Sequence, residues 1–449
     1  MKTSLFTGVN NAVRGLQHAQ HAVTVHGTNI AHANDPAYTR RQVLAPTEGG
    51  MTGPGIARIR DLFIDEQFRY ASGSLGNAEV RQDVLSKVED IMGDPVNGGL
   101  RKALDQFFDA WQALADEPTS GVARLQVLQA GRLFVNEIQT AYRAFSSLQE
   151  TVNLDLEDRS REVNQLLEQV FSLNKRISYL SRNNMNDADL RDQRDLALDR
   201  LAKLVGATAT EGKDGVVRIS VGSVVVLDGP TVMKLKITES GTPVWESGDG
   251  FQQVFTGGGA VAGLVSVRDG ELSVMKAEIA RLAQQVASAV NGIYGASAKA
   301  GEGQPVPFFV NASNPQMLAV NPAITAEGLV AGTQGPSDGS VARQIAELAT
   351  VGIAGWTGST VVSQDKMTPG AFYQNLVGWL GTRASDANLA YDVAKAHVEV
   401  SEEHRQSSWG VSLDEEVASL SMQQKAFAAC SRVIAIMDAM LQDLLNAIR

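Results

Sequence analysis

Apolar and small side chains recur at alternating steps of three and four residues near both ends of the chain. The two sets are Leu5, Val9, Ala12, Leu16, Ala19, Val23, His26 and Ile30, and Phe427, Cys430, Ile434, Met437, Leu441, Leu444 and Ile448. This spacing places one stripe along each of two helices, as in a coiled coil. Pro36 disfavours helix in the residue before it and so ends the first helix. We therefore predict that residues 1–33 and 416–449 pair as one discontinuous terminal coiled-coil domain.

Longer helical patterns fill most of the chain between these ends. They predict a return helix that ends at residue 205, a kink at residues 408–410, and helices over residues 62–92, 100–115, 122–129, 134–180, 271–294, 340–349 and 369–420. Residues 132–205 contain no glycine or proline, which favours long uninterrupted helices. We therefore predict an elongated helical-bundle body made of residues 34–206 and 271–415.

Short β-branched runs interrupt the helical pattern in the middle of the chain. They lie between glycine-bearing turns, at residues 216–219, 224–227, 232–237 and 261–267. Such runs are typical of strands, so residues 207–270 are predicted to form a small β domain inserted into the body. Residues 295–340 are rich in glycine, proline and asparagine and are predicted to be irregular, with short strands near 308–310 and 317–320. The predicted fold class is mainly α with a small nested β insertion.

The chain is acidic overall, with 39 basic and 50 acidic side chains and a formal charge of −11 over 449 residues. The first 60 residues run against this balance, with six basic and two acidic groups. Because these basic residues are scattered and few aromatic side chains accompany them, we expect no nucleic-acid binding. A single cysteine, Cys430, excludes a disulfide framework. Four prolines in the charge-free residues 303–326 exclude a membrane-spanning helix there, and we expect no cleaved secretory signal.

The first helix has an unusual polar face. Among the first 34 residues only Lys2 and Arg14 are charged. Amides fill the rest of that face, at Asn10, Asn11, Gln17 and Gln20. A solvated face normally carries charges, so this one is predicted to pack against protein. Ordering about 30 residues at each end costs about 1–2 kcal/mol per residue, whereas the seam side chains return only roughly 1–3 kcal/mol apiece. We infer that both ends gain full order only when further copies or partner subunits surround them.

The search for chemistry favours a structural role. P-loop, HExxH, GxSxG and EF-hand patterns are all missing from the sequence. The acidic residues between 187 and 199 alternate with arginines, which indicates an ion-paired helix face. His18 and His21 could face one metal ion, but no third ligand lies nearby in sequence, and His26 could make assembly sensitive to pH. We predict no catalytic, cofactor or metal site. The alternatives left open are an enzyme hidden in the β insertion and a monomeric coiled-coil adaptor.

Several short motifs resemble those of the flagellar axial proteins, the family of rod, hook and hook-associated proteins. Near the start these are Ser4-Leu5-Phe6, Asn29-Ile30-Ala31, Ala33-Asn34 and Tyr38-Thr39-Arg40. Two further blocks are similar to the hook-associated protein 1 branch of this family. They are residues 410–448, which include Asp414, Glu415 and Glu416, and the run Asp192, Gln193, Arg194 and Asp195. The family usually has a glycine before the tyrosine, where this chain has Ala37.

The resemblance implies a structural subunit of the bacterial flagellum, not an enzyme, at the junction between hook and filament. It implies export through the flagellar type III apparatus without signal cleavage, an extracellular location, and assembly of copies through their terminal helices. The implied partners are the hook protein below, a second junction protein (hook-associated protein 3) above and an export chaperone on the C-terminal helix, with no cofactor and no membrane insertion. A hook or distal-rod protein is the alternative within the family. The implied assembly residues are Leu5, Val9, Leu16, Val23, Ile30, Phe427, Ile434, Met437, Leu441, Leu444 and Ile448.

Overall fold

The computed structural model describes residues 2–35, 37–44, 55–93, 99–183, 185–212, 214–297, 306–356, 358–362 and 364–448. For residues 2–6, 444, 447 and 448 it describes the helical backbone only. The chain divides into two compact units. Unit 1 comprises Met1–Gly76, Arg159–Ala260 and Val393–Arg449, and unit 2 comprises Asn77–Asp158 and Val261–Asp392.

Helices dominate the described residues, joined by small antiparallel sheets, so the predicted mainly α fold class is confirmed. The helices are α1 (Lys2–Ala31), α2 (Leu62–Met92), α3 (Gly99–Asp116), α4 (Gly121–Arg182), α5 (Ala188–Val205), α6 (Gly259–Val267), the π-helical turn η1 (Arg268–Leu272), α7 (Ser273–Ser297), α8 (Ser340–Val351), α9 (Pro369–Trp409) and α10 (Leu413–Ile448). The strands are β1 (Arg41–Leu44), β2 (Gly55–Arg58), β3 (Ala207–Glu211), β4 (Val217–Val221), β5 (Val224–Asp228), β6 (Thr231–Val232), β7 (Lys234–Ile237), β8 (Pro243–Glu246), β9 (Gln252–Val254), β10 (Phe309–Val310), β11 (Ala319–Val320), β12 (Ile353–Ala354) and β13 (Lys366–Met367).

Most helix boundaries follow the sequence pattern closely. Helix α2 has the predicted bounds, and the predicted kink at residues 408–410 is a break between α9 and α10. Helix α4 joins two predicted segments because it continues through Gly131. A Cβ built at Gly131 would lie 3.1 Å from Val320 and 3.2 Å from Phe308. Close packing of a neighbouring segment in unit 2 therefore explains this glycine better than a helix break does.

The prediction of a strand at residues 261–267 is wrong, because these residues form most of α6. The segment is apolar on nearly every side, and a short buried run of this kind cannot be assigned to helix or strand from periodicity alone. Gly259 begins the helix with a φ of 66°, a left-handed conformation that favours glycine. A Cβ there would also lie 2.5 Å from the carbonyl carbon of Leu204.

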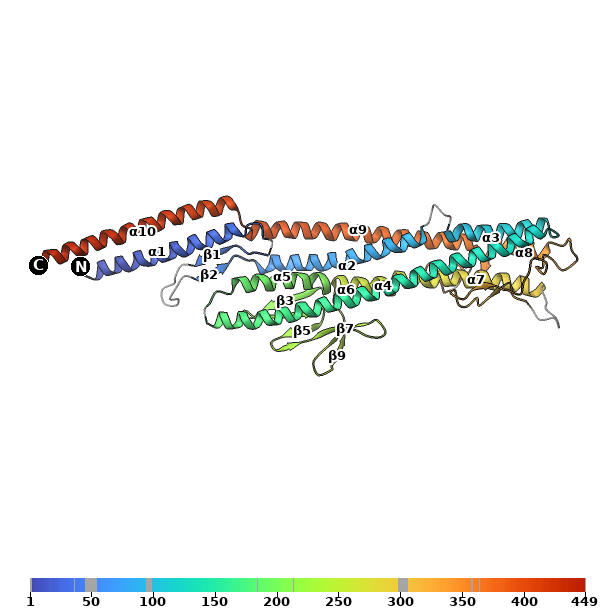
Figure 1. The fold of residues 1–449 in the computed structure, drawn as a ribbon, viewed down its shortest axis with the longest axis horizontal. Helices are drawn as coiled ribbons and strands as arrows, with labels where there is room; N and C mark the ends of the chain where they lie inside the picture. Colours follow the sequence, from blue (N-terminus) through green and yellow to red (C-terminus); the bar gives the residue numbers. More distant parts are fainter. Residues whose placement is uncertain are drawn as a thin grey trace. The chain divides into compact units, whose positions relative to one another are not determined.

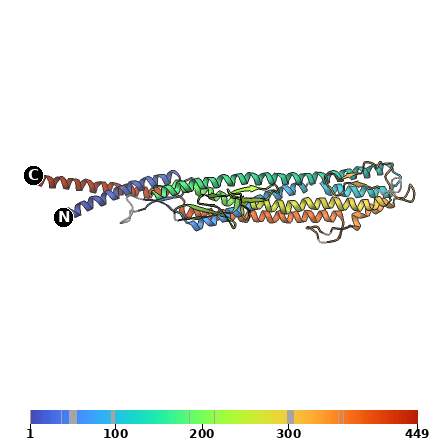
Figure 2. The ribbon, with the colours of Figure 1, turned by 90° about the horizontal axis from the view of Figure 1, so that it is seen from below.

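In unit 1 the terminal helices α1 and α10 lie side by side and antiparallel, with both chain ends at the same end of the pair (Figures 1 and 2). We call them the terminal helix pair. Unit 1 also holds the β1–β2 hairpin, a four-stranded antiparallel sheet ordered β3-β4-β5-β6 and a three-stranded antiparallel sheet ordered β7-β8-β9. The last sheet buries Trp245, which lies opposite Leu235 and Gln253 in the register.

Helical asparagines fasten strands to helices at several places. In unit 1 the Asn164 amide donates to the carbonyl of Leu235 at 2.9 Å and accepts from its N–H at 2.8 Å. Asn174 binds the backbone of Val217 in the same two-sided way, at 2.8 and 3.1 Å. A side-chain amide carries one donor side and one acceptor side, as a neighbouring strand does. These side chains therefore satisfy strand groups that would otherwise be buried without partners.

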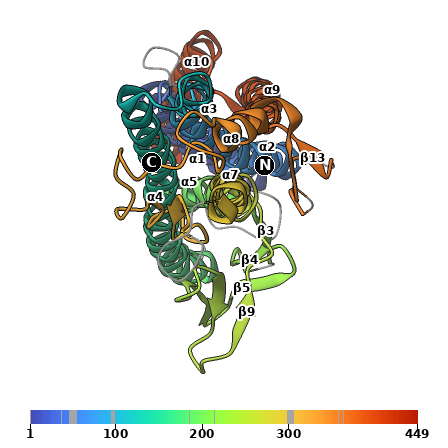
Figure 3. The ribbon, with the colours of Figure 1, turned by 90° about the vertical axis from the view of Figure 1, so that its right-hand side faces the viewer.

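Unit 2 is built on bulky aromatic side chains. Helices α3, α7 and α8 group together here, seen end on in Figure 3. Phe107 of α3 stacks on Phe134 of α4 at 5.8 Å between ring centroids, and Phe308 meets Trp111 at 5.3 Å. All four rings are buried. Fully buried aromatic side chains remove a large apolar area from water, which makes this cluster the natural core of unit 2.

Units 1 and 2 do not coincide with the three predicted segments. Residues 207–260 fall within unit 1 together with the terminal helices, whereas residues 261–270 fall within unit 2. The terminal coiled-coil, body and β segments as separate folding domains remain a prediction.

Candidate assembly interface

Small residues let α1 and α10 approach closely. A Cβ built at Gly8 would lie 2.6 Å from Cε of Met437, and one at Gly15 would lie 2.9 Å from Sγ of Cys430. Further small residues on α1 are buried, at Ala12, Ala19 and Ala22. The closest approaches of α1 to α10 are therefore made at glycines, with Met437 opposite Gly8 and Cys430 opposite Gly15. The buried residues of α1 also include Val25 and Asn29.

The predicted assembly residues lie beside or within this seam. On α1, Val9, Leu16, Val23 and Ile30 are half-buried and repeat every seven residues next to the small ones. The half-buried residues predicted on α10 are Ile434, Met437 and Leu441. Phe427 keeps 39% of its surface exposed. The side chains of Leu5, Leu444 and Ile448 lie outside the described residues, and assembly through any of these positions remains a prediction.

A second apolar stripe on α10 lies about 100° around the helix from the seam and is exposed. We call it the outer stripe; its members are Met422, Ala426, Ala429, Val433, Ile436 and Met440, which alternate steps of four and three residues. The exposed fractions of its larger side chains are 62% for Met422, 40% for Val433, 61% for Ile436 and 48% for Met440. Only Arg432 and Asp438 are charged between residues 426 and 441. A helix that is apolar on nearly every side is normally buried, yet α1 covers only one side of α10.

At the other end of the pair, Glu416 joins α10 to α1 through a buried polar cluster. Its carboxylate is fully buried and accepts hydrogen bonds from His26 Nδ1 at 2.6 Å, Asn29 Nδ2 at 2.9 Å and Arg40 Nε at 2.6 Å. We call these four residues the Glu416 cluster. Burial opposes ionisation, but the hydrogen bonds from His26 and Asn29 and the charge of Arg40 outweigh it and hold the pKa of Glu416 below its usual value. Neighbouring Glu415 is exposed and pairs with Arg40 at 3.1 Å.

Asn29 connects the Glu416 cluster to the first hairpin. Its amide oxygen accepts from the Tyr38 hydroxyl at 2.7 Å and from the N–H of Arg41 at 3.1 Å, and its amide nitrogen also donates to the Arg41 carbonyl at 2.9 Å. With the bond to Glu416, both sides of this buried amide are satisfied. Burial raises the pKa of Tyr38 to about 12, against the opposing effect of the Arg41 charge. Four family-motif positions, Asn29, Tyr38, Arg40 and Glu416, thus meet at one place.

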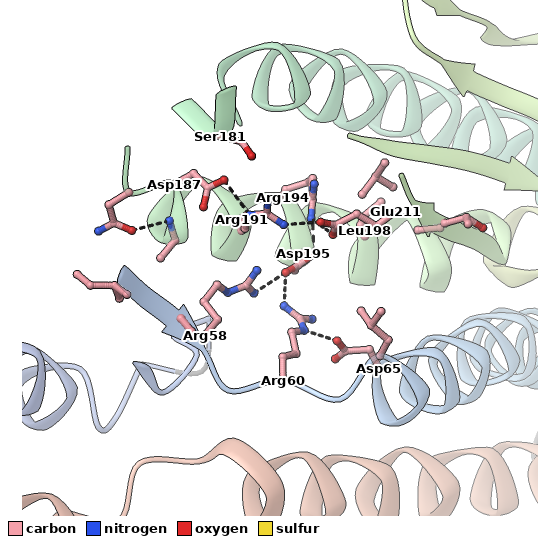
Figure 4. A pocket seen from close by; sticks show the side chains of 18 of the residues that line it. Arg58, Arg60, Asp65, Ser181, Asp187, Arg191, Arg194, Asp195, Leu198 and Glu211 are labelled. Carbon is pink, nitrogen blue, oxygen red and sulfur yellow. Dashed lines mark hydrogen bonds and ion pairs between the residues drawn. The ribbon is translucent and has the colours of Figure 1, made fainter. Parts of the chain in front are cut away.

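Arginines from the start of the chain converge on the acidic residues of α5. Figure 4 shows Arg58 and Arg60 reaching Asp195, with Asp65 on the other side of Arg60. The network continues through Arg41 with Asp189 and Asp192, Arg58 with Asp192, and Arg69 and Arg405 with Asp199. The basic residues of the first 60 positions are scattered in sequence, but Arg40, Arg41, Arg58 and Arg60 all pair with carboxylates in unit 1. The early excess of positive charge was the signal that could have found this network.

Part of the ion-pair network, including Arg58, Arg60 and Asp195, lines a cavity of about 950 Å³ (Figure 4). Burial would raise the pKa of Asp195, but the charges of Arg60 and Arg58 outweigh it and hold that pKa below its usual value. The guanidinium and carboxylate groups of the lining compensate one another. This arrangement favours a structural role for the cavity over binding of a charged ligand, in keeping with the ion-paired helix face predicted for α5.

The remaining predicted positions stand apart from these contacts. Asn34, Gln193 and Asp414 are exposed, whereas Arg194 is buried and donates to the Gly215 carbonyl at 2.6 Å and to Glu211 at 2.8 Å. Ala37 adopts no positive φ, so the glycine usual at this turn is not required for it here. Within the described ranges no three histidine, cysteine or acidic side chains are grouped to hold a metal ion, and no helix is long and apolar enough to cross a membrane.

Two protein-family models match the chain. The model of the flagellar hook-associated protein FlgK helical domain matches residues 85–309, and the model of the flagellar basal body rod FlgEFG protein C-terminal matches residues 404–447. The second match covers most of α10 and carries the name of basal body rod proteins. The first belongs to the hook-associated protein and disfavours the alternative of a hook or distal-rod protein.

Similar proteins agree with this assignment. Flagellar hook-associated protein 1 of Bacillus subtilis is 25% identical over 99% of this chain and 98% of its own length. The protein of that name from Salmonella typhimurium is 24% identical over 63% of this chain and 55% of its own length. The solved structure of the flagellar hook junction protein FlgK from Burkholderia pseudomallei shares the fold, with a TM-score of 0.63 at 15% identity over 76% of this chain and 100% of that one. Because the helical-domain match alone spans half of the sequence, this chain belongs to the flagellar hook-associated protein 1 (FlgK) family and is a structural subunit of the hook–filament junction.

Proposed function

We propose that copies of this chain assemble at the hook–filament junction by packing their terminal helices against one another. The observation that carries the proposal is the outer stripe of α10, which stays exposed in a single chain. Contiguous exposed apolar surface of this kind marks an interaction site. A neighbouring copy supplies the missing cover, which explains why α10 carries apolar residues beyond the side that α1 covers.

The surface of α1 offers a matching contact. Val9, Leu16, Val23 and Ile30 are half-buried beside the glycine–alanine seam. Next to them lie exposed amides in place of charges, at Asn10, Asn11, Gln17 and Gln20. We propose that the outer stripe of one copy packs on this surface of the next. Such a contact joins two different surfaces, and contacts of that type build rings or helical arrays rather than closed dimers.

The proposal extends to the partners and the location of the chain, and the resemblance to the family supports it. The hook protein is the proposed partner below and hook-associated protein 3 the proposed partner above, with the assembled chain outside the cell after flagellar type III export. Before assembly, the exposed apolar surface of α10 favours aggregation. We propose that an export chaperone covers it until then, and that the chain works without a cofactor and catalyses no reaction.

The experiment places a charge in the outer stripe. Ile436→Glu is expected to abolish assembly, because a buried unpaired carboxylate in the contact is costly, while the thermal unfolding of the single chain stays nearly unchanged. The matched control is Leu154→Glu, at another exposed apolar position on a helix. Cells carrying either variant as their only copy are scored for hooks with attached filaments. Normal filaments with Ile436→Glu would contradict the proposal, as would equal loss with both variants.

A further inference from the structure

The alignment of α1 against α10 repeats at intervals of seven residues. The contacts are Gly8 with Met437, Gly15 with Cys430, and Asn29 with Glu416. Each step of seven residues along α1 is matched by seven residues back along α10. The pair is thus an antiparallel coil in heptad register, and buried Ala22 occupies the remaining position of the repeat on α1.

The small residues of this seam do not select a register by themselves. Gly8, Gly15 and Ala22 differ from one another by no more than a methyl group. Sliding α10 by one heptad, about 10 Å along the axis, therefore exchanges nearly equivalent positions. A shift of one residue would turn a different face of α10 toward α1. A slide of one heptad keeps small residues of α1 at the contact, and small residues provide few shape constraints.

Glu416 does distinguish the registers. In the observed alignment its fully buried carboxylate has three donors, His26, Asn29 and Arg40. A slide of one heptad in one direction brings Glu416 opposite Ala22, where the seam offers a methyl group. A slide in the other direction carries it beyond the end of α1 at Ala31. Either slide separates a buried charge from its partners, which is strongly unfavourable.

We infer that Glu416 is the positioning residue that fixes the register of the terminal helix pair and thereby decides which faces remain for neighbouring copies. The second half of this inference rests on the proposed assembly, whereas the register itself is a property of the single chain. A buried polar residue that specifies the alignment of a coiled coil has this role in other helical pairs. Exposed Glu415, which also binds Arg40, provides a matched control one residue away.

The native Cys430 serves as a reporter of register in the full-length chain. Gly15→Cys adds a Cβ at a position that lies 2.9 Å from Cys430 Sγ, which suits a disulfide. Gly8→Cys and Ala22→Cys report the two registers slid by one heptad. Each cysteine variant is oxidised with diamide at low protein concentration, and intramolecular cross-linking is followed on non-reducing gels. The three variants are then combined with Glu416→Leu and, separately, with Glu415→Leu.

With Glu416 present, Gly15→Cys is expected to cross-link at least about tenfold faster than Gly8→Cys or Ala22→Cys. Glu416→Leu should reduce this preference to about threefold or less. Glu415→Leu should preserve it. Circular dichroism checks that each variant remains folded, and Glu416→Gln replaces Glu416→Leu where folding fails. An unchanged preference without the Glu416 carboxylate overturns the inference, and so does the absence of a cross-link from Gly15→Cys. Because the readout uses single chains, a failure here leaves the assembly proposal intact, and failed assembly with the correct register overturns only that proposal.

Discussion

In unit 2 the helices meet through large aromatic side chains, whereas α1 approaches α10 most closely at its glycines. Phe107, Trp111 and Phe134 are each fully buried, and each removes about 150–250 Å² from water. Among its described side chains, α1 buries the apolar residues Ala12, Ala19, Ala22 and Val25. These remove less apolar area than the aromatic rings do, and Gly8 and Gly15 have no side chain to bury. Unit 2 therefore carries its own stability, whereas the terminal helix pair gains close contact and alignment with less stabilisation.

The outer surfaces differ in the same direction. The aromatic cluster of unit 2 is enclosed, whereas α10 keeps an exposed apolar stripe along the helix. A helix pair with a weak seam and an unused apolar face is suited to being completed by a neighbour. These two features are the physical reason for the proposed assembly through the terminal helices.

The largest effect is expected from removing an aromatic ring of unit 2. Phe107→Ala leaves a cavity among Phe134, Phe308 and Phe309 and should lower the free energy of unfolding by about 3–5 kcal/mol. Urea unfolding followed by circular dichroism measures it. The matched control, Phe251→Ala, removes a largely exposed ring and should change stability by less than about 0.5 kcal/mol. Similar losses of unfolding free energy for both variants would show that the aromatic cluster does not stabilise unit 2 in this way.

Acid should weaken unit 1 through its carboxylates. The pKa values of Glu416 and Asp195 are lower in the folded chain than in the unfolded one. A depressed pKa stabilises the fold above the unfolded pKa, and that stabilisation is lost as pH falls through the folded pKa. Urea unfolding of the wild type should therefore show stability declining between about pH 5 and about pH 3.

Glu416→Gln tests the source of that decline. The variant should be less stable than the wild type near neutral pH and should lose less stability on acidification, because its amide does not titrate. Parallel acid limbs for the two chains would show that Glu416 contributes nothing to the decline.

The smallest effects, of opposite sign, are expected from two glycines of α1. Gly27→Ala should stabilise the helix by roughly 0.5–1 kcal/mol, because alanine is the better helix former and nothing lies within 4 Å of its new methyl group. Gly15→Ala forces its methyl group against Cys430 and should destabilise the pair instead. Amide exchange of α1 measures both. Stabilisation by both substitutions would mean that α1 and α10 do not pack closely in the single chain.

Helices were predictable from the sequence because their apolar residues are large and regularly spaced, as in α2 and α4. The C-terminal seam at Cys430 and Met437 was found for the same reason. The seam of α1 was harder to locate, because Gly8 and Gly15 carry no hydrophobic signal while neighbouring Val9 and Leu16 do. The stripe of large residues was predictable, but not which of its neighbours faces α10.

The polar clusters could be predicted only in part. Asp192 and Asp195 were noted, yet their partners Arg41, Arg58 and Arg60 come from a hairpin that carries no strong strand signal. Ion pairs between segments more than 100 residues apart depend on the tertiary fold, which periodicity does not specify. The convergence of Asn29 and Arg40 on Glu416 has the same cause.

Hydrogen–deuterium exchange of the single chain and of its assembled form tests most directly whether the terminal helices depend on neighbouring copies. In dilute solution, amides of α1 and of α10 beyond Glu416 should exchange far faster than those of α3 and α7. Assembly should slow the exchange of the terminal helices to a rate comparable with that of α3 and α7. Terminal helices as strongly protected as α7 in a proven monomer would contradict the account.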